Sequence, residues 1–139
     1  MKGISGVTHS SDLKTWGIVN EPVTLVFMQP HLHMRGTTMD IKVTYPDGRS
    51  EMLISVPRYN YLWQIIYIQD KPLKLPKGTR IDVIATWDNS AFNLFNPDPS
   101  QRVRWGAQSW EEMMVAILGV TADRSVDPKK VLSMWWNVR

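Results

Sequence analysis

Two histidines separated by a single residue give the clearest chemical signal in this sequence. His31 and His33 follow a short apolar run, and residues two apart in an extended segment project to the same face. Two imidazoles presented side by side suit zinc, copper, iron or nickel. The alternative is a pair of surface or hydrogen-bonded histidines that bind no metal. The pair alone leaves both interpretations open.

Residues that could complete a metal site lie eighty positions further along the chain, in the stretch EEMM. A carboxylate from Glu111 or Glu112 beside two histidines would suit non-haem iron. The soft thioether of Met113 would instead favour copper, above all in its reduced state. Met113 and Met114 can equally be side chains that fill the core. Spacing alone does not choose among these alternatives.

The composition is that of one globular domain and excludes several classes of function. The chain has 139 residues, of which 43% are hydrophobic and 21% charged. The net charge of +3 is mild and the basic residues are scattered, so we expect no nucleic-acid partner. There is no apolar run of membrane-spanning length and no signal-peptide pattern. The absence of cysteine excludes disulfides and thiolate metal sites.

Apolar or alternating runs separated by turn signals predict an all-β chain. Pro46-Asp47-Gly48 predicts a tight turn, and residues 88–104, rich in Asn, Asp and Pro, predict a long loop. Loops of that length in compact domains are usually functional. The even spacing predicts an antiparallel β-sandwich of jelly-roll type. The expected strands are residues 22–29, 38–45, 50–56, 61–68, 79–87 and 105–120.

The two ends of the chain are expected to flank a single domain over residues 14–122. Residues 1–13, which include His9, are polar and rich in Gly and Ser, so they are predicted to be a flexible segment. Residues 123–139 are predicted to be a tail. Within it, Asp127 followed by proline is typical of a helix N-terminus, so a short helix is expected over residues 128–136.

The two candidate metal motifs together resemble those of a known family. QPHLHMRG (29–36) resembles the first metal motif, and SWEEMM (109–114) the second, in the C-terminal catalytic domain of copper type II, ascorbate-dependent monooxygenases. That family includes the peptidylglycine hydroxylating enzyme and dopamine β-hydroxylase. The resemblance spans about residues 14–120 and depends on both motifs occurring in order. Other stretches look like its bacterial members: YPDGR (45–49), VPRYNYLWQ (56–64), PKGT (76–79) and DNSAFNLFNPDPSQRVRWG (88–106).

By this resemblance, His31, His33 and Met113 are the ligands of a copper ion that activates O2 to hydroxylate a C–H bond. Ascorbate would be the reductant and a small organic molecule the substrate. The family fold is a pair of β-sandwiches, of which this chain would be the second. The resemblance also implies a periplasmic or extracellular location. Residues of the kind that hold histidine ligands in place are expected among Gln29, Asp88, Asn89 and Gln108.

Two departures from the family bear on the expected function. The family has a second, electron-transfer copper held by three histidines of an N-terminal domain, and the three histidines of this chain cannot supply both sites. The chain is therefore expected to be a fragment or a split half that needs that domain as a partner. The positions that anchor the substrate carboxylate in the peptide enzyme are Gln29, Val115 and Ile117 here, so a peptidylglycine substrate is not expected. The alternatives are a non-enzymatic copper-binding module, a jelly-roll oxygenase with a two-histidine, one-carboxylate iron site, and a carbohydrate-binding sandwich whose histidines bind no metal.

Overall fold

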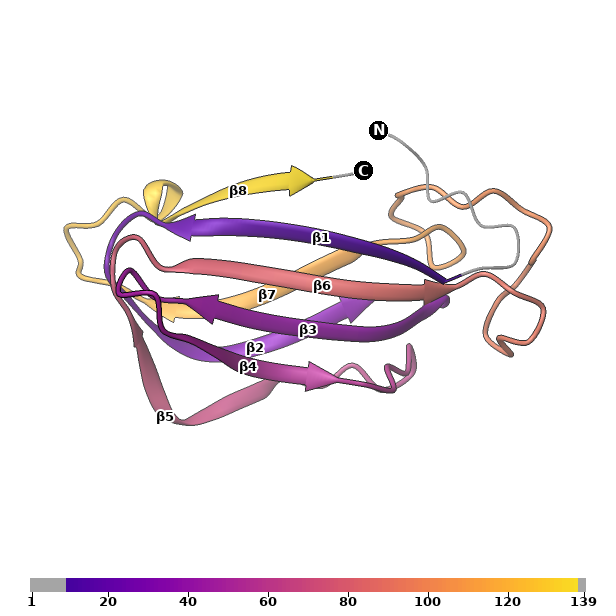
Figure 1. Cartoon of the computed structure of the whole chain (residues 1–139), viewed down its shortest axis with the longest axis horizontal. Helices are drawn as coiled ribbons and strands as arrows, with labels where there is room; N and C mark the ends of the chain where they lie inside the picture. Colours follow the sequence, from indigo (N-terminus) through magenta and orange to yellow (C-terminus); the bar gives the residue numbers. More distant parts are fainter. Residues whose placement is uncertain (1–9, 138–139) are drawn as a thin grey trace.

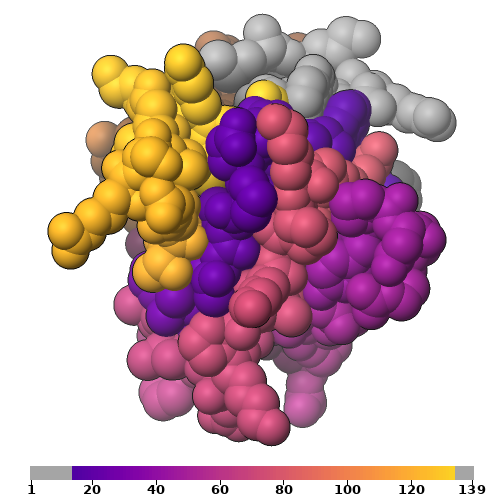
Figure 2. Space-filling model, turned by 90° about the vertical axis from the view of Figure 1, so that its left-hand side faces the viewer, coloured from indigo at the N-terminus to yellow at the C-terminus, as the bar shows by residue number. Residues whose placement is uncertain are grey.

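The computed structural model describes residues 10–137, in which eight strands form two packed antiparallel sheets. The larger sheet has the order β4-β3-β6-β1-β8 and the smaller one the order β5-β2-β7 (Figure 1). In Figure 2 the C-terminal segment, β1, β6 and the β3–β4 hairpin lie side by side in the order of the larger sheet. The predicted all-β sandwich is therefore confirmed. The elements are β1 (Ser10–Val19), β2 (Val23–Leu32), β3 (Gly36–Thr44), β4 (Ser50–Val56), β5 (Tyr67–Leu75), β6 (Arg80–Asp88), β7 (Met114–Thr121), the 3-10 turn η1 (Pro128–Lys130) and β8 (Leu132–Asn137).

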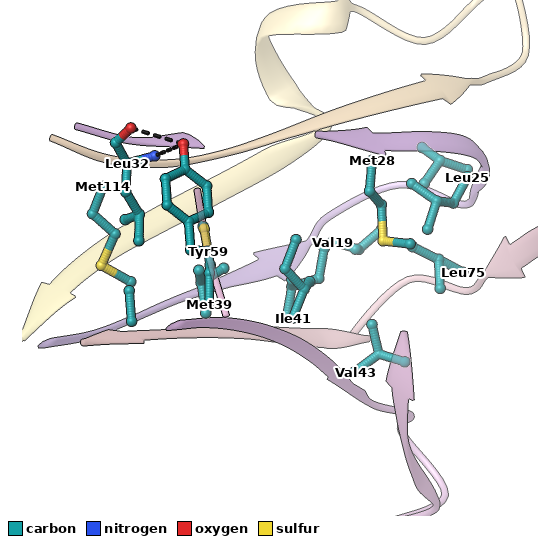
Figure 3. Close-up of a cluster of buried hydrophobic side chains, with 14 of the residues drawn as sticks. Val19, Leu25, Met28, Leu32, Met39, Ile41, Val43, Tyr59, Leu75 and Met114 are labelled. Atoms are coloured by element: carbon teal, nitrogen blue, oxygen red, sulfur yellow. Dashed lines mark hydrogen bonds between the residues drawn. The ribbon is translucent and has the colours of Figure 1, made fainter. Parts of the chain in front are cut away.

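Alternate residues of the strands point inward and form the core between the sheets. Among the buried side chains are Leu25, Met28 and Leu32 of β2, Met39, Ile41 and Val43 of β3, and Val83 and Ala85 of β6. Near one end of this core the Tyr59 hydroxyl donates to the Leu32 carbonyl at 2.8 Å and accepts from the Leu32 backbone N–H at 2.9 Å (Figure 3). Tyr59 thereby fixes the last residue of β2 from the opposite side of the core.

Several predicted elements are found close to their expected positions. The strands expected at 22–29, 38–45 and 79–87 correspond to β2, β3 and β6, and β4 has the predicted bounds. The turn between β3 and β4 has Gly48 at φ 86°, the left-handed conformation that its sequence predicted.

The strand expected at 61–68 is wrong in its first six residues, because β5 begins only at Tyr67. The preceding residues form a turn and an irregular segment. The Asn60 carbonyl accepts a hydrogen bond from the Trp63 backbone N–H at 2.9 Å. The Asn60 side chain also accepts a backbone hydrogen bond in the same turn. These local bonds outweigh the β-propensity of the aromatic and β-branched residues that follow.

One other strand prediction and the prediction of a flexible N-terminal segment need correction. The strand expected at 105–120 begins at Met114, and the residues before it form a loop. Residues 10–13, expected in the flexible segment, are the start of β1, because pairing with β6 satisfies their backbone groups whatever the polarity of their side chains. His9 and the rest of that segment lie outside the described residues.

The helix expected over residues 128–136 is also wrong. Asp127 does act as an N-cap, since its side chain accepts from the Lys129 backbone N–H, but the helical turn ends at Lys130. The residues that follow form β8, which pairs with the otherwise open edge of β1. Ladder hydrogen bonds with β1 therefore decide the structure of this segment. Across the described part of the chain, no helix has the length and apolar character needed to cross a membrane.

Candidate metal centre

His31 and His33 lie where β2 ends, on the outer face of the three-stranded sheet. Leu32 between them is fully buried in the core, so alternation directs the two histidines to the opposite side. Their ring centres are 5.1 Å apart, with the ring planes at 86°. Two imidazoles that share one ion, each through a nitrogen at roughly 2 Å and at a roughly tetrahedral angle, have ring centres about 5 Å apart. The spacing of the pair therefore fits a shared metal ion.

Met113 directly precedes β7 and is directed to the same face of the sheet. In the antiparallel register His31 lies opposite Val115, and Leu32 lies opposite Met114. Met114 is only 5% exposed and packs in the core, so alternation directs its neighbour Met113 outward. Met113 precedes Met114 and His33 follows Leu32, so each lies one residue beyond the last pair of the ladder. The sheet register thus directs the three residues that the sequence singled out to the same face, although Met113 lies eighty positions beyond His33 in the chain.

His33 carries the one buried side-chain nitrogen or oxygen atom without a hydrogen-bond partner among the described residues. Its side chain is nearly inaccessible, and its Nδ1 has no partner. Burial, followed by the charge of His31, lowers the pKa of His33, while the backbone carbonyls of Glu111 and Gln108 act in the opposite direction. The ring is therefore neutral at pH 7, which is the form that binds metals. Because a buried nitrogen without a partner is unfavourable, this atom fits a site that is completed by an ion.

Glu112 ties the end of β2 to the start of β7. Its side chain is 1% exposed, and one carboxylate oxygen accepts from the Arg35 backbone N–H at 2.7 Å. The other oxygen accepts from the backbone N–H of His33 at 3.1 Å and from the indole N–H of Trp87 at 2.8 Å. Burial raises the pKa of Glu112 to about 7, although these donors act to lower it. The carboxylate thus holds the backbone on both sides of His33 in place.

The same bonds bear on the alternative iron site. Both oxygens of Glu112 already accept hydrogen bonds from backbone or indole N–H donors. Glu111 accepts the backbone N–H of Gln108 at 2.9 Å, which closes a local turn. In the described part of the chain, no three His, Cys, Asp or Glu side chains are grouped so that they could hold a metal. The side chains that alternation directs to this face, two imidazoles and a thioether, are of types that suit copper better than iron.

Arg35 fixes the long loop that precedes Met113. This side chain is 2% exposed, and its Nε donates to the Asn89 side chain at 2.7 Å. Its Nη1 donates to the Trp110 carbonyl at 2.7 Å. The loop itself is a series of side-chain-capped turns, of which the first is made by Asp88 accepting the Ser90 backbone N–H. The expected functional loop is therefore an ordered segment anchored at a buried arginine.

The hydrogen-bond partner of His31 is Gln64, which sequence reasoning missed. The Gln64 Oε1 lies 2.6 Å from His31 Nδ1. Its signal in the sequence was its place at the end of VPRYNYLWQ, one of the stretches on which the expected resemblance was based. The four residues expected to hold the rings have other contacts: Gln29 donates to the Gln64 carbonyl, Asp88 caps Ser90, Asn89 binds Arg35, and Gln108 donates to Glu111.

The rows of β2 and β7 beside the histidines carry apolar side chains, one glutamine and no charged residue. On this face, β2 and β7 place His31 opposite Val115. Two residues further along the ladder Gln29 lies opposite Ile117, and after that Phe27 lies opposite Gly119. The Phe27 ring lies over Gly119, where a β-carbon would overlap it. Further exposed apolar side chains belong to the segment that contains Gln64 and to the long loop that precedes Met113: Leu62, Trp63, Ile65, Ile66, Phe92, Leu94, Phe95, Trp105 and Trp110.

Comparison with known proteins gives no assignment for this chain. No protein-family model matches it, and no curated protein matches it either.

Proposed function

We propose that this chain is a copper-binding monooxygenase domain in which His31, His33 and Met113 hold the copper. The observation that carries the proposal is the pair of imidazoles, 5.1 Å apart and edge to face, one of which has a buried Nδ1 without a partner. The register that directs Met113 to the same face supports a third, soft ligand. Occupation of Glu112 by backbone and indole donors favours Met113 over a carboxylate.

Copper bound at this face would supply the redox chemistry that inserts one atom of O2 into a substrate C–H bond. The reaction consumes O2, two electrons and two protons, and it gives the alcohol and one water. An ascorbate-type reductant would supply the electrons. The chain's own residues fix the histidine rings and keep His33 away from water. Because the chain contains three histidines, a three-histidine electron-transfer site would have to come from a partner domain.

The substrate of this site is proposed to be a neutral organic molecule. The rows next to the histidines carry Val115, Ile117 and Phe27, with Gln29 as their polar member. None of these side chains can form an ion pair with a carboxylate. Apolar contact with the sheet would therefore hold the substrate beside His31.

X-ray absorption of the copper-loaded, reduced protein tests the metal site. We expect metal–sulfur scattering that disappears in Met113→Leu and persists in Met114→Leu, a matched change of the neighbouring methionine that packs in the core. Copper content should fall in His31→Ala and His33→Ala. Lack of metal–sulfur scattering in the unaltered protein would remove Met113 from the site.

A second experiment distinguishes an oxygenase from a non-enzymatic copper-binding module. The copper-loaded chain is mixed with a separately expressed three-histidine copper domain, ascorbate and a neutral organic substrate. Formation of hydroxylated product that depends on both domains supports the oxygenase. If ascorbate is oxidised and no product forms with any neutral substrate tested, the binding module is the better description.

A further inference from the structure

The hydrogen bond between His31 and Gln64 determines which nitrogen of His31 carries the proton. The Gln64 side chain has one donor end and one acceptor end. Its Nε2 donates to the Tyr61 carbonyl at 2.8 Å, and a carbonyl can only accept. The acceptor end, Oε1, is therefore the atom that lies 2.6 Å from His31 Nδ1. A neutral ring bound in this way must carry its proton on Nδ1, which leaves the lone pair on Nε2.

Gln64 is itself held by neighbours on two sides. The Gln29 side chain donates to the Gln64 carbonyl at 3.5 Å. The Tyr61 hydroxyl and the Ser109 hydroxyl lie 2.6 Å apart, which links the Gln64 segment to the loop that leads into Met113. The Tyr61 ring also stands edge-on to the His33 ring, with centres 6.4 Å apart. The segment therefore contacts both histidines and the loop that precedes the methionine.

We propose that Gln64 is a positioning residue that holds His31 in the Nδ1–H form and so directs Nε2 toward the metal. The inference rests on the proposed copper site for its function, whereas the proton position itself is a property of the metal-free protein. Partners of this kind fix the tautomer and the ring orientation of histidine ligands, and their loss typically weakens metal binding by about 10–100-fold.

The direct test is the tautomer of His31 in the metal-free protein, read from the ring 15N shifts by NMR at a pH where the ring is neutral. We expect Nδ1–H in the unaltered protein. In Gln64→Leu, which offers no acceptor, the ring should shift toward Nε2–H. Gln64→Glu keeps an oxygen at this position and should restore Nδ1–H. Gln69→Leu, a half-buried glutamine in β5, is the matched control and should leave the His31 signals unchanged.

Copper(I) affinity is measured on the same four proteins. It should fall by about 10–100-fold in Gln64→Leu and stay unchanged in Gln69→Leu. An Nε2–H ring in the unaltered protein overturns the inference, as does a Gln64→Leu variant with unchanged tautomer and affinity. If the unaltered protein shows Nδ1–H and binds no copper, the proposed function fails while the tautomer assignment stands. If Gln64→Leu does not fold, the tautomer of His31 in the unaltered protein still decides the proton position.

Discussion

Leu32 lies directly opposite Met114 in the pair formed by β2 and β7, and both side chains are buried in the core. Side chains alternate along a strand with a period of two, so a slip of one residue in β7 would bury Met113 and expose Met114 instead. This one pair therefore decides which of two adjacent methionines is directed to the outer face of the sheet, the face that carries the histidines. The ladder of backbone hydrogen bonds ends at this pair. Beyond it, the Glu112 side chain connects the two segments by accepting hydrogen bonds from the backbone N–H groups of His33 and Arg35.

Replacement of Glu112 by glutamine should destabilise the protein. The carboxylate accepts hydrogen bonds from the backbone N–H groups of His33, Arg35 and Met113 and from the Trp87 indole. Whichever way the amide points, its NH2 group faces at least one N–H donor. The free energy of unfolding, measured in urea, should fall by about 1–3 kcal/mol. Asp70→Asn, an exposed change in β5, is the control and should leave it unaltered. Equal stability of the two variants would contradict this role of Glu112.

Replacement of His33 by leucine should affect the metal-free and copper-loaded proteins in opposite ways. Without copper, the change removes a buried nitrogen that has no partner, so the free energy of unfolding should stay constant or rise by about 1 kcal/mol. Copper at roughly 100 times its dissociation constant should stabilise the unaltered protein by about 2.7 kcal/mol. The variant should lose that gain. Urea unfolding with and without copper(I) measures both quantities.

His31→Leu provides the contrast to this result. His31 is only half-buried, and its ring bonds to Gln64. The leucine leaves the Gln64 oxygen without its partner, so the metal-free protein should lose stability instead of gaining it. Both variants should be insensitive to copper. A copper-dependent stability that survives in His33→Leu would show that the ion binds elsewhere.

Much of the fold follows from sequence patterns that are local. Alternation located β2, β3 and β6, in which one face is buried, and the turn signal at Pro46-Asp47-Gly48 located the start of β4. The predictions that failed concern segments whose structure depends on contacts with distant parts of the chain. β8 forms because β1 offers it an open edge, and no pattern within residues 128–136 encodes that edge.

The candidate site could be predicted only in part for the same reason. The His31 and His33 pair is visible because two residues in one strand share a face whatever the fold. Gln64 lies in a segment whose apolar residues predicted a strand, and its contact with His31 exists only because that segment forms a turn. The role of Arg35 likewise depends on bonds to residues 54 and 75 positions away, which no spacing rule supplies.

Replacement of Arg35 by lysine should loosen the segment that leads into Met113. The guanidinium reaches the Asn89 side chain with Nε and the Trp110 carbonyl with Nη1, both at 2.7 Å. A lysine keeps the charge but has no planar fork that can bridge two acceptors in this arrangement. The bond from its backbone N–H to Glu112 is retained. The variant should therefore fold while losing side-chain anchorage of the loop.

Hydrogen exchange followed by mass spectrometry checks this result. The amides of residues 105–113 should exchange faster in Arg35→Lys, while those of the core strand β6 should keep their protection. Copper(I) affinity should fall in parallel by about 10-fold or more, because the loop positions the third proposed ligand. Arg58→Lys, an exposed arginine beyond the end of β4, is the matched control. If exchange in the loop rises and affinity does not change, Met113 contributes nothing to copper binding, and the two histidines hold the ion without it.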